Sequence, residues 1–344
     1  MTHIFYIHSN ICIISSYSTI ERLVNNGERV IIILERSTLF PYFRGKVETY
    51  NVQEVIDKYR RNSTTLIGKV LNYRFTLYPQ CKKFAKRIIN REDAIVYTPS
   101  YNMYSVRPFL DSKYCKGYFY IEDGALSYLS AESLHKRYYK RKYKGGLFLM
   151  SLLGAGEKPD CYVNKKFMGC VGVSEYAYPW CMKNKVITSV TEFFSIQSYE
   201  DLGVKHVIIS DYLRGDCSVI LDAFNKVIDR IEREDHPKII AIKFHPSAYT
   251  YELEKTKKLK NEIKKKYNNI EFIFLSSQYS IETMMYFTSV QLYSIFGASS
   301  LLLYALVLKS KAFMVNHKDK LITIRELPTV QDFVDYSNRQ YEYR

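Results

Sequence analysis

The chain lacks several features that would assign it to a class of protein at once. Its seven cysteines are scattered, odd in number and without a CxxC pair. That pattern argues against a disulfide framework and against a zinc site, and it suits a reducing cytosol. No apolar run approaches the roughly 20 residues of a membrane-spanning helix, and the first residues lack the basic and apolar regions of a signal peptide. We therefore expect a cytoplasmic protein, which would sit peripherally on the inner face of the cytoplasmic membrane if it works at a membrane.

Acidic residues are also in deficit. Lys and Arg number 50 against 35 Asp and Glu, which gives a formal net charge of +15. An excess of this size predicts an acidic partner, which would be nucleic acid, an anionic membrane face or a negatively charged substrate. With 344 residues, of which 47% are hydrophobic, the chain is globular and long enough for two domains.

Strand and helix patterns alternate along the chain in two successive series. The apolar runs are continuous, as expected for parallel strands buried on both faces of a sheet. Expected strands lie at 4–7, 29–34, 94–97 and 117–121 in the first series, and at 206–210, 238–244, 271–275, 290–295 and 311–315 in the second. We therefore predict an α/β protein with two Rossmann-like domains facing across a central cleft. Its predicted parts are a first domain at 1–185, a linker at 186–204, a second domain at 205–325 and a C-terminal tail at 326–344.

Three short polar motifs follow predicted strands, at the ends where ligands bind in an open α/β sheet. They are Glu122-Asp123-Gly124, His245-Pro246 and Gly297-Ala298-Ser299-Ser300. An acid after a strand could act as a general base, and a histidine there can titrate near neutral pH. Small residues and serines at a helix start favour an anion. Each motif also fits an ordinary turn, loop or helix cap, so none of them decides the function alone.

A basic stretch supports a rival hypothesis. The ten residues from His135 to Lys144 include seven Lys, Arg or His and no acid. Such a run could follow a nucleic-acid backbone or bind anionic lipid headgroups. In the rival hypothesis the protein is a nucleic-acid-binding or membrane-docking module, with Lys136–Lys144 as its working surface.

Together, the motifs and their order resemble the bacterial sialyltransferases with a GT-B fold, that is, the lipooligosaccharide sialyltransferases and the capsular polysialyltransferases. That family shares an acid-acid-glycine motif, a His-Pro motif and a Ser-Ser or Ser-Thr motif. The resemblance covers the catalytic core of both halves. It implies a metal-independent, inverting enzyme that transfers sialic acid from CMP-sialic acid to a hydroxyl of a cell-surface glycan, which would be lipooligosaccharide, O-antigen or capsule.

The resemblance also implies roles for individual residues. Asp123 would be the general base on the acceptor hydroxyl, with Glu122 as its competitor, and His245 would protonate or hydrogen-bond the leaving phosphate. The residues expected to hold CMP and its phosphate are Ser299, Ser300, Glu282, Lys243, Pro246 and Gly297, with Glu282 on the ribose. Residues at strand ends of the first half that could contact the acceptor are Ser9, Asn10 and Ser100.

No cofactor is expected besides the donor substrate CMP-sialic acid. The sequence contains no Asp-x-Asp pair, which is the usual metal-binding element of metal-dependent nucleotide-sugar sites, so no metal is expected either. The implied partners are CMP-sialic acid, an acceptor glycan ending in galactose or sialic acid, and an anionic membrane surface at Lys136–Lys144; nucleic acid is not expected. One alternative keeps the fold and changes the donor, for instance to CMP-Kdo, and the other is the basic binding module.

Overall fold

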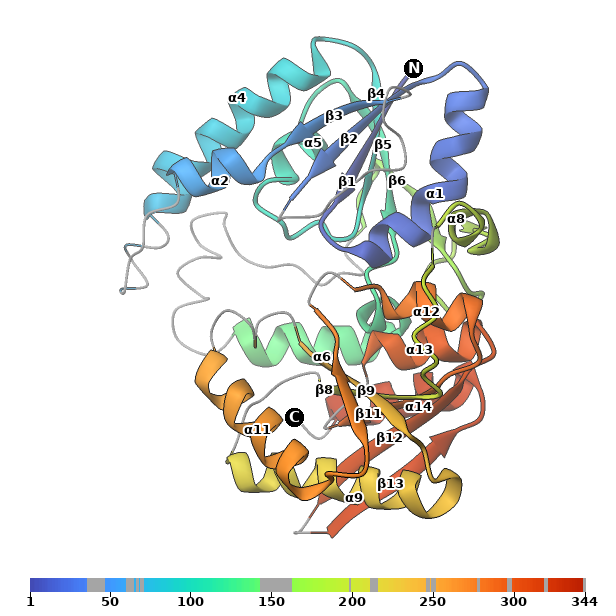
Figure 1. Ribbon diagram of the computed structural model, residues 1–344. Coiled ribbons are helices and arrows are strands. Elements are labelled where there is room, and N and C mark those ends of the chain that lie inside the picture. The colour runs from blue at the N-terminus through green and yellow to red at the C-terminus, as the bar shows by residue number, and fades with distance from the viewer. Residues whose placement is uncertain are drawn as a thin grey trace. The chain divides into compact units, whose positions relative to one another are not determined.

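A computed structural model gives the fold of the chain (Figure 1). It describes residues 1–35, 47–59, 65, 68, 71–142, 163–197, 199–210, 216–245, 248, 252–276, 279–295, 299–318 and 321–342. The chain divides into two compact units. Unit 1 is Met1–Ser195 with Asn338–Arg344, and unit 2 is Ile196–Ser337.

Unit 1 is built on a seven-stranded parallel sheet in the order β3-β2-β1-β4-β5-β6-β7. The strands are β1 (Thr2–Ile7), β2 (Arg29–Leu34), β3 (Glu48–Asn51), β4 (Ala94–Thr98), β5 (Cys115–Ile121), β6 (Phe167–Gly172) and β7 (Asn184–Ile187). In β1, an interior strand of the sheet, Ile4, Phe5 and Ile7 are fully buried. A strand covered on both faces needs such a continuous apolar run, which is why the sequence shows no alternation here.

Helices connect these strands. They are α1 (Asn10–Asn25), α2 (Gln53–Tyr59), the π-helix η1 (Asn72–Leu77) leading into α4 (Tyr78–Ile89), α5 (Arg107–Leu110), the 3-10 helix η2 (Ala125–Tyr128), α6 (Ala131–Lys142) and α8 (Thr191–Ser195). α1 begins directly after β1 because Ser9 caps it: the Ser9 hydroxyl oxygen accepts a hydrogen bond from the Cys12 N–H at 3.4 Å.

Unit 2 holds a six-stranded sheet in the order β10-β9-β8-β11-β12-β13. Its strands are β8 (His206–Ser210), β9 (Ile239–Phe244), β10 (Glu271–Phe274), β11 (Gln291–Ile295), β12 (Lys311–Lys318) and β13 (Leu321–Leu327). Its helices are α9 (Cys217–Asp235), α11 (Leu253–Lys266), α12 (Ile281–Phe287) and α13 (Ser300–Val307), together with α14 (Val330–Glu342) as far as Ser337; the last residues of α14 belong to unit 1. All neighbouring strands are parallel except β12 and β13. α9 and α11 pack on the sheet in one apolar core that contains Phe224, Leu259 and Phe244.

Both sheets reverse their strand order at the first strand of the unit. In unit 1 the chain adds β2 and β3 on one side of β1 and then β4 on the other side. In unit 2 it adds β9 and β10 on one side of β8 and then β11 on the other side. Such switch points open a crevice at the carboxyl ends of the two diverging strands, which is where open α/β sheets bind ligands.

Two predicted segments carry more structure than expected. The units divide after Ser195, inside the predicted linker 186–204, yet the first part of that stretch holds the end of β7 and the whole of α8. The segment 326–344 was expected to be a tail, but its start completes β13 and most of the rest forms α14. Burial of an apolar face stabilises α14 as a helix, and Phe333 on this face is fully buried. None of the described helices is long and apolar enough to span a membrane.

Candidate active site

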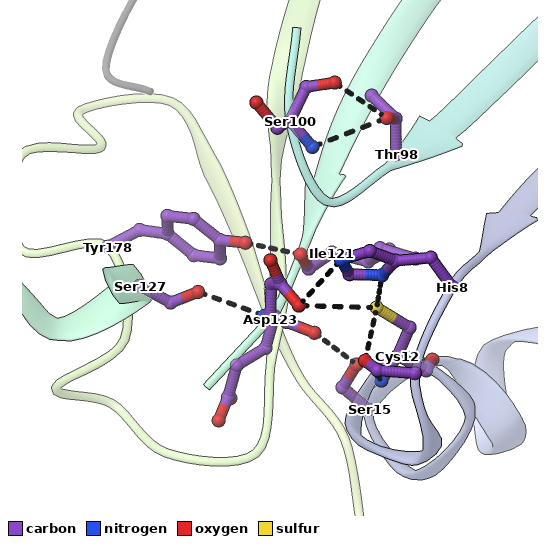
Figure 2. A network of polar contacts seen from close by, with 11 residues as sticks. His8, Cys12, Ser15, Thr98, Ser100, Ile121, Asp123, Ser127 and Tyr178 are labelled. Atoms are coloured by element: carbon purple, nitrogen blue, oxygen red, sulfur yellow. Dashed lines mark hydrogen bonds and ion pairs between the residues drawn. The ribbon is translucent and has the colours of Figure 1, made fainter. Parts of the chain in front are cut away.

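Four sequence-predicted residues of unit 1 gather at the carboxyl edge of its sheet, around the switch point. Ser9 follows β1, Ser100 follows β4, and Glu122 and Asp123 follow β5. Figure 2 shows this edge, with the side chain of Asp123 pointing toward the first turn of α1. Parallel pairing of β1, β4 and β5 places these chain ends at one edge.

Glu122 is a buried structural acceptor. Its exposed fraction is 0%. The Tyr128 hydroxyl donates to Glu122 Oε1 at 3.1 Å, and the Val173 N–H donates to Oε2 at 2.8 Å. The end of β6 also packs against this carboxylate, since a Cβ added at Gly172 would lie 3.2 Å from the same Oε2. Both oxygens are therefore engaged inside unit 1.

Asp123, in contrast to Glu122, is partly exposed to solvent. Its side chain is 25% exposed, and its Oδ1 lies 3.2 Å from His8 Nε2. The Cys12 thiol contacts the same Oδ1 at 3.9 Å. The Asp123 N–H donates to the Ser127 hydroxyl oxygen at 3.0 Å, and Gly124 has a φ of 90°, which only glycine adopts easily. The turn after β5 thus buries one acid and leaves the other at the surface of the edge.

His8 and Cys12 complete this cluster, and sequence reasoning missed both. His8 Nδ1 lies 3.3 Å from Cys12 Sγ, so the two ring nitrogens face a thiol and a carboxylate. Burial alone would lower the pKa of His8, but the contacts with Cys12 and Asp123 outweigh burial and raise that pKa to about 10. His8 directly precedes Ser9 and Asn10, which the sequence had marked as strand-end residues. The sequence therefore indicated the end of this strand, but His8, the residue that contacts Asp123, lies one position before the two residues that were marked.

The three acceptor candidates differ in what they already bind. Besides capping α1, Ser9 donates its hydroxyl to Cys12 Sγ at 3.2 Å. The Ser100 hydroxyl oxygen accepts from the Asn102 N–H at 3.0 Å within its own turn. Asn10 is exposed at the start of α1. A contact of any of these residues with an acceptor stays a prediction.

In unit 2, His245 and Ser299 follow strands on either side of β8. The His245 N–H donates to the Ser210 carbonyl at 2.9 Å, which ties the residue to the end of β8. Ser299 caps α13 by accepting the Leu301 N–H at 3.3 Å, and Ser300 begins the helix. Parallel pairing puts all of them at the carboxyl edge of the sheet. Pro246 and Gly297 lie outside the described residues.

Lys243 and Glu282 of unit 2 lie close enough to interact electrostatically. The Lys243 ammonium donates to the Tyr279 carbonyl. Burial lowers the pKa of Lys243, while the charge of Glu282 opposes that shift. Glu282 lies at the start of α12 with an exposed fraction of 7% and accepts a 3.2 Å hydrogen bond from the Ser280 hydroxyl. The structure therefore brings these two predicted residues together, largely inside the unit.

The basic stretch lies mostly on α6. Within the side chains described there, Lys136 is exposed and pairs with Glu132 at 2.8 Å, one helical turn earlier. Ion pairs of this exposed kind add little stability. Beyond Lys136 the side chains of the run lie outside the description.

A cysteine in the same unit offers a direct check of local electrostatics. The Cys181 N–H donates to the Tyr178 carbonyl at 2.9 Å, and the Tyr178 hydroxyl donates to the Ile121 carbonyl at the end of β5. A hydrogen bond from Cys170 lowers the pKa of the partly exposed Cys181 to about 6, helped by Lys183 and Lys185.

We expect iodoacetamide to alkylate Cys181 at a rate that rises through about pH 6, because the thiolate is the nucleophile and its fraction grows as the pH passes the pKa. Peptide mapping by mass spectrometry at a series of pH values measures the rate. The Cys181→Ser variant should lose the labelled peptide. A rate that rises only near the ordinary thiol pKa of about 8.5 would contradict the assignment.

Two parallel-sheet α/β units, each with a switch point, define the class of this chain as the GT-B fold. UDP-N-acetylglucosamine 2-epimerase from Rickettsia bellii aligns with a TM-score of 0.51 and 10% identity, over 100% of this chain and 95% of that one. S. aureus MnaA, in a co-structure with UDP, aligns with a TM-score of 0.50 and 10% identity, over 97% and 86%. A sialyltransferase GT-B domain from Photobacterium damselae aligns with a TM-score of 0.48 and 10% identity, over 100% of this chain and 96% of that one. No protein-family model and no curated protein sequence matches the chain.

Proposed function

We propose that the protein is a metal-independent, inverting sialyltransferase that transfers sialic acid from CMP-sialic acid to a hydroxyl of a bacterial cell-surface glycan. The observation that carries this proposal is the different environment of two adjacent acids. Glu122 has both oxygens engaged in the interior, whereas Asp123 is partly exposed at the switch-point edge. Only the second has the accessibility that a general base needs. Structures of this fold include one protein named for a UDP-sugar and one solved with UDP, which supports a nucleotide sugar as the donor class.

On the acceptor side, Asp123 is the base. His8 and Cys12 both contact its Oδ1, so we assign the proton of the acceptor hydroxyl to Oδ2. Removing that proton as the oxygen attacks the sugar is general base catalysis. A single attack opposite the leaving group inverts the anomeric centre, through a transition state with oxocarbenium character.

On the donor side, the leaving phosphate gathers negative charge that must be stabilised. His245 protonates or hydrogen-bonds it, and the hydroxyls and first N–H groups at Ser299 and Ser300 supply further donors. Glu282 is assigned to the ribose hydroxyls and Lys243 to the wall of the nucleotide pocket. The net charge of +15 favours both an anionic donor and a sialylated acceptor.

The test is CMP release from CMP-sialic acid in EDTA, with and without a galactoside or a sialylated acceptor. Parallel reactions contain CMP-Kdo and UDP-GlcNAc in place of the donor. We expect release that the acceptor stimulates, with CMP-sialic acid alone among the donors. Turnover of CMP-Kdo would keep the fold and change the donor, and conversion of UDP-GlcNAc without an acceptor would replace the transferase by an epimerase. If the protein neither turns over nor binds any of these donors, the result would favour the binding module with the basic stretch as its working surface.

His245→Ala should lower acceptor-stimulated CMP release by roughly 10²-fold, because one positioned donor to the leaving phosphate is lost. The second His-Pro pair of the chain gives a matched control. His236 is the C-cap of α9, ahead of β9, with a φ of 44° that Asn tolerates. His236→Asn should therefore keep full activity. Equal losses in the two variants would remove His245 from the reaction.

A further inference from the structure

We propose that His8, Cys12 and Asp123 form a binding site for a soft divalent transition-metal ion, with Zn²⁺ as the best chemical match, and that metal bound there blocks the Asp123 carboxylate. The inhibitory half of this inference rests on the proposed function, whereas metal binding itself does not. The three residues come from the end of β1, the first turn of α1 and the turn after β5. Figure 2 shows their side chains pointing toward one another.

The donor atoms lie near one another, and two of their separations are close to those that a small ion requires. One ligand atom from each residue can be chosen so that all lie within 4.8 Å of one another. His8 Nε2 is 3.2 Å from Asp123 Oδ1, and Cys12 Sγ is 3.9 Å from the same oxygen. Around tetrahedral zinc, with bonds of about 2.0 Å to nitrogen and oxygen and 2.3 Å to sulfur, these separations are roughly 3.3 and 3.5 Å. The ring nitrogen near Cys12 Sγ is Nδ1, at 3.3 Å, so metal binding requires the imidazole to turn until one nitrogen faces both partners.

The chemistry of the donors selects the metal class. Thiolate, imidazole and carboxylate together suit Zn²⁺ and its substitute Co²⁺, and they do not suit Mg²⁺ or Ca²⁺, which prefer oxygen ligands. Binding forms three metal–ligand bonds and releases to solvent the Cys12 thiol proton and, when the ring is charged, one imidazole proton. No oxidant or other reactant is needed.

Neighbouring groups stabilise the Cys12 thiolate, and the exposed side of Asp123 gives a metal ion access from solvent. The Ser9 hydroxyl donates to Cys12 Sγ at 3.2 Å, and Cys12 lies in the first turn of a sixteen-residue helix, where negative charge is favoured. Cys12 and His8 are buried, but the Asp123 side chain is 25% exposed. The fourth coordination position therefore opens on the side where Asp123 meets solvent.

This site differs from the metal site that the absence of Asp-x-Asp argues against. That pair would present a metal to the phosphates of the donor, whereas here the ion binds Oδ1 of the proposed base. A cation at Oδ1 withdraws negative charge from the whole carboxylate, so Oδ2 becomes a much weaker acceptor for the proton of the acceptor hydroxyl. Zinc should therefore inhibit the reaction, and EDTA should restore it.

The test of binding uses Co²⁺ as a spectroscopic probe and needs no substrate. It is done in the Cys181→Ser background, because Cys170 and Cys181 are a second thiol pair in the same unit. We expect a thiolate-to-cobalt charge-transfer band that saturates at one equivalent of Co²⁺ and disappears on addition of Zn²⁺. Cys12→Ser should lose the band, and His8→Ala should weaken Co²⁺ binding by at least roughly tenfold. Cys115→Ser, a buried thiol elsewhere in unit 1, should keep it.

Absence of the band in the parent protein, or its survival in Cys12→Ser, would overturn the site. Should Cys12→Ser fail to fold, Asp123→Asn replaces it, with a band of the same origin and at least roughly tenfold weaker binding. In the CMP-release assay without chelator, half-inhibition by Zn²⁺ should fall at the Zn²⁺ dissociation constant obtained from the competition with Co²⁺. If the protein binds Co²⁺ as expected but turns over no donor, the proposed function is wrong and the metal site stands. If the protein turns over its donor at the same rate with Zn²⁺ bound, only the inhibitory role is wrong.

Discussion

Asp123→Asn is expected to lower acceptor-stimulated CMP release by roughly 10²- to 10⁴-fold, the range in which a general base contributes. The amide has nearly the shape of the carboxylate, and its oxygen can still accept from His8 Nε2, now 3.2 Å from Oδ1. It has no useful basicity, however, so the acceptor hydroxyl keeps its proton. Single-turnover CMP release at saturating donor measures the effect.

Affinity for CMP gives the control for this variant. Asp123 belongs to unit 1, whereas the residues assigned to the nucleotide belong to unit 2. The CMP dissociation constant of Asp123→Asn should therefore match that of the parent protein within about twofold, on the expectation that separate sites act independently. Activity within tenfold of the parent protein would mean that another group takes the proton.

Glu122→Ala is expected to destabilise the protein by about 2–5 kcal/mol, because it removes the carboxylate that accepts hydrogen bonds from the Tyr128 hydroxyl and the Val173 N–H inside the unit. Loss of the acceptor of a buried donor costs about 1–3 kcal/mol, and the missing side chain also leaves a cavity. Urea unfolding, followed by the fluorescence of Trp180 in unit 1, reports the change in the free energy of unfolding.

Glu122→Gln separates a structural role from a catalytic one. The glutamine oxygen can accept the Val173 N–H while its amide donates to the Tyr128 oxygen, so we expect a loss of only about 1 kcal/mol. If Glu122 acts only in the fold, this variant keeps activity within about tenfold, in contrast to Asp123→Asn. A well-folded Glu122→Gln protein as inactive as Asp123→Asn would make Glu122 the base and refute the assignment drawn from burial.

Much of the fold could be predicted because its signals are local in the chain. The run Arg29–Leu34 is β2, and 206–210 is β8, since uninterrupted apolar residues of strand length form buried parallel strands. The GT-B class is confirmed by the two sheets and by the structures that share the fold. The antiparallel pairing of β12 with β13 was not anticipated, because the hairpin at the edge of a parallel sheet has no signal of its own in the alternation of strands and helices.

The sequence by itself determined where polar residues leave the sheets. Parallel strands all end at one edge, so Asp123, His245 and Ser299 had to lie at carboxyl edges once their strands were recognised. Only the tertiary structure decided which acid of the pair is buried and which is exposed. The partners that distinguish them, Val173 and His8, lie 51 and 115 residues away from Glu122 and Asp123 respectively. Periodicity reports on neighbours within a few residues, whereas these contacts exist only because separate strands and helix starts converge at a switch point.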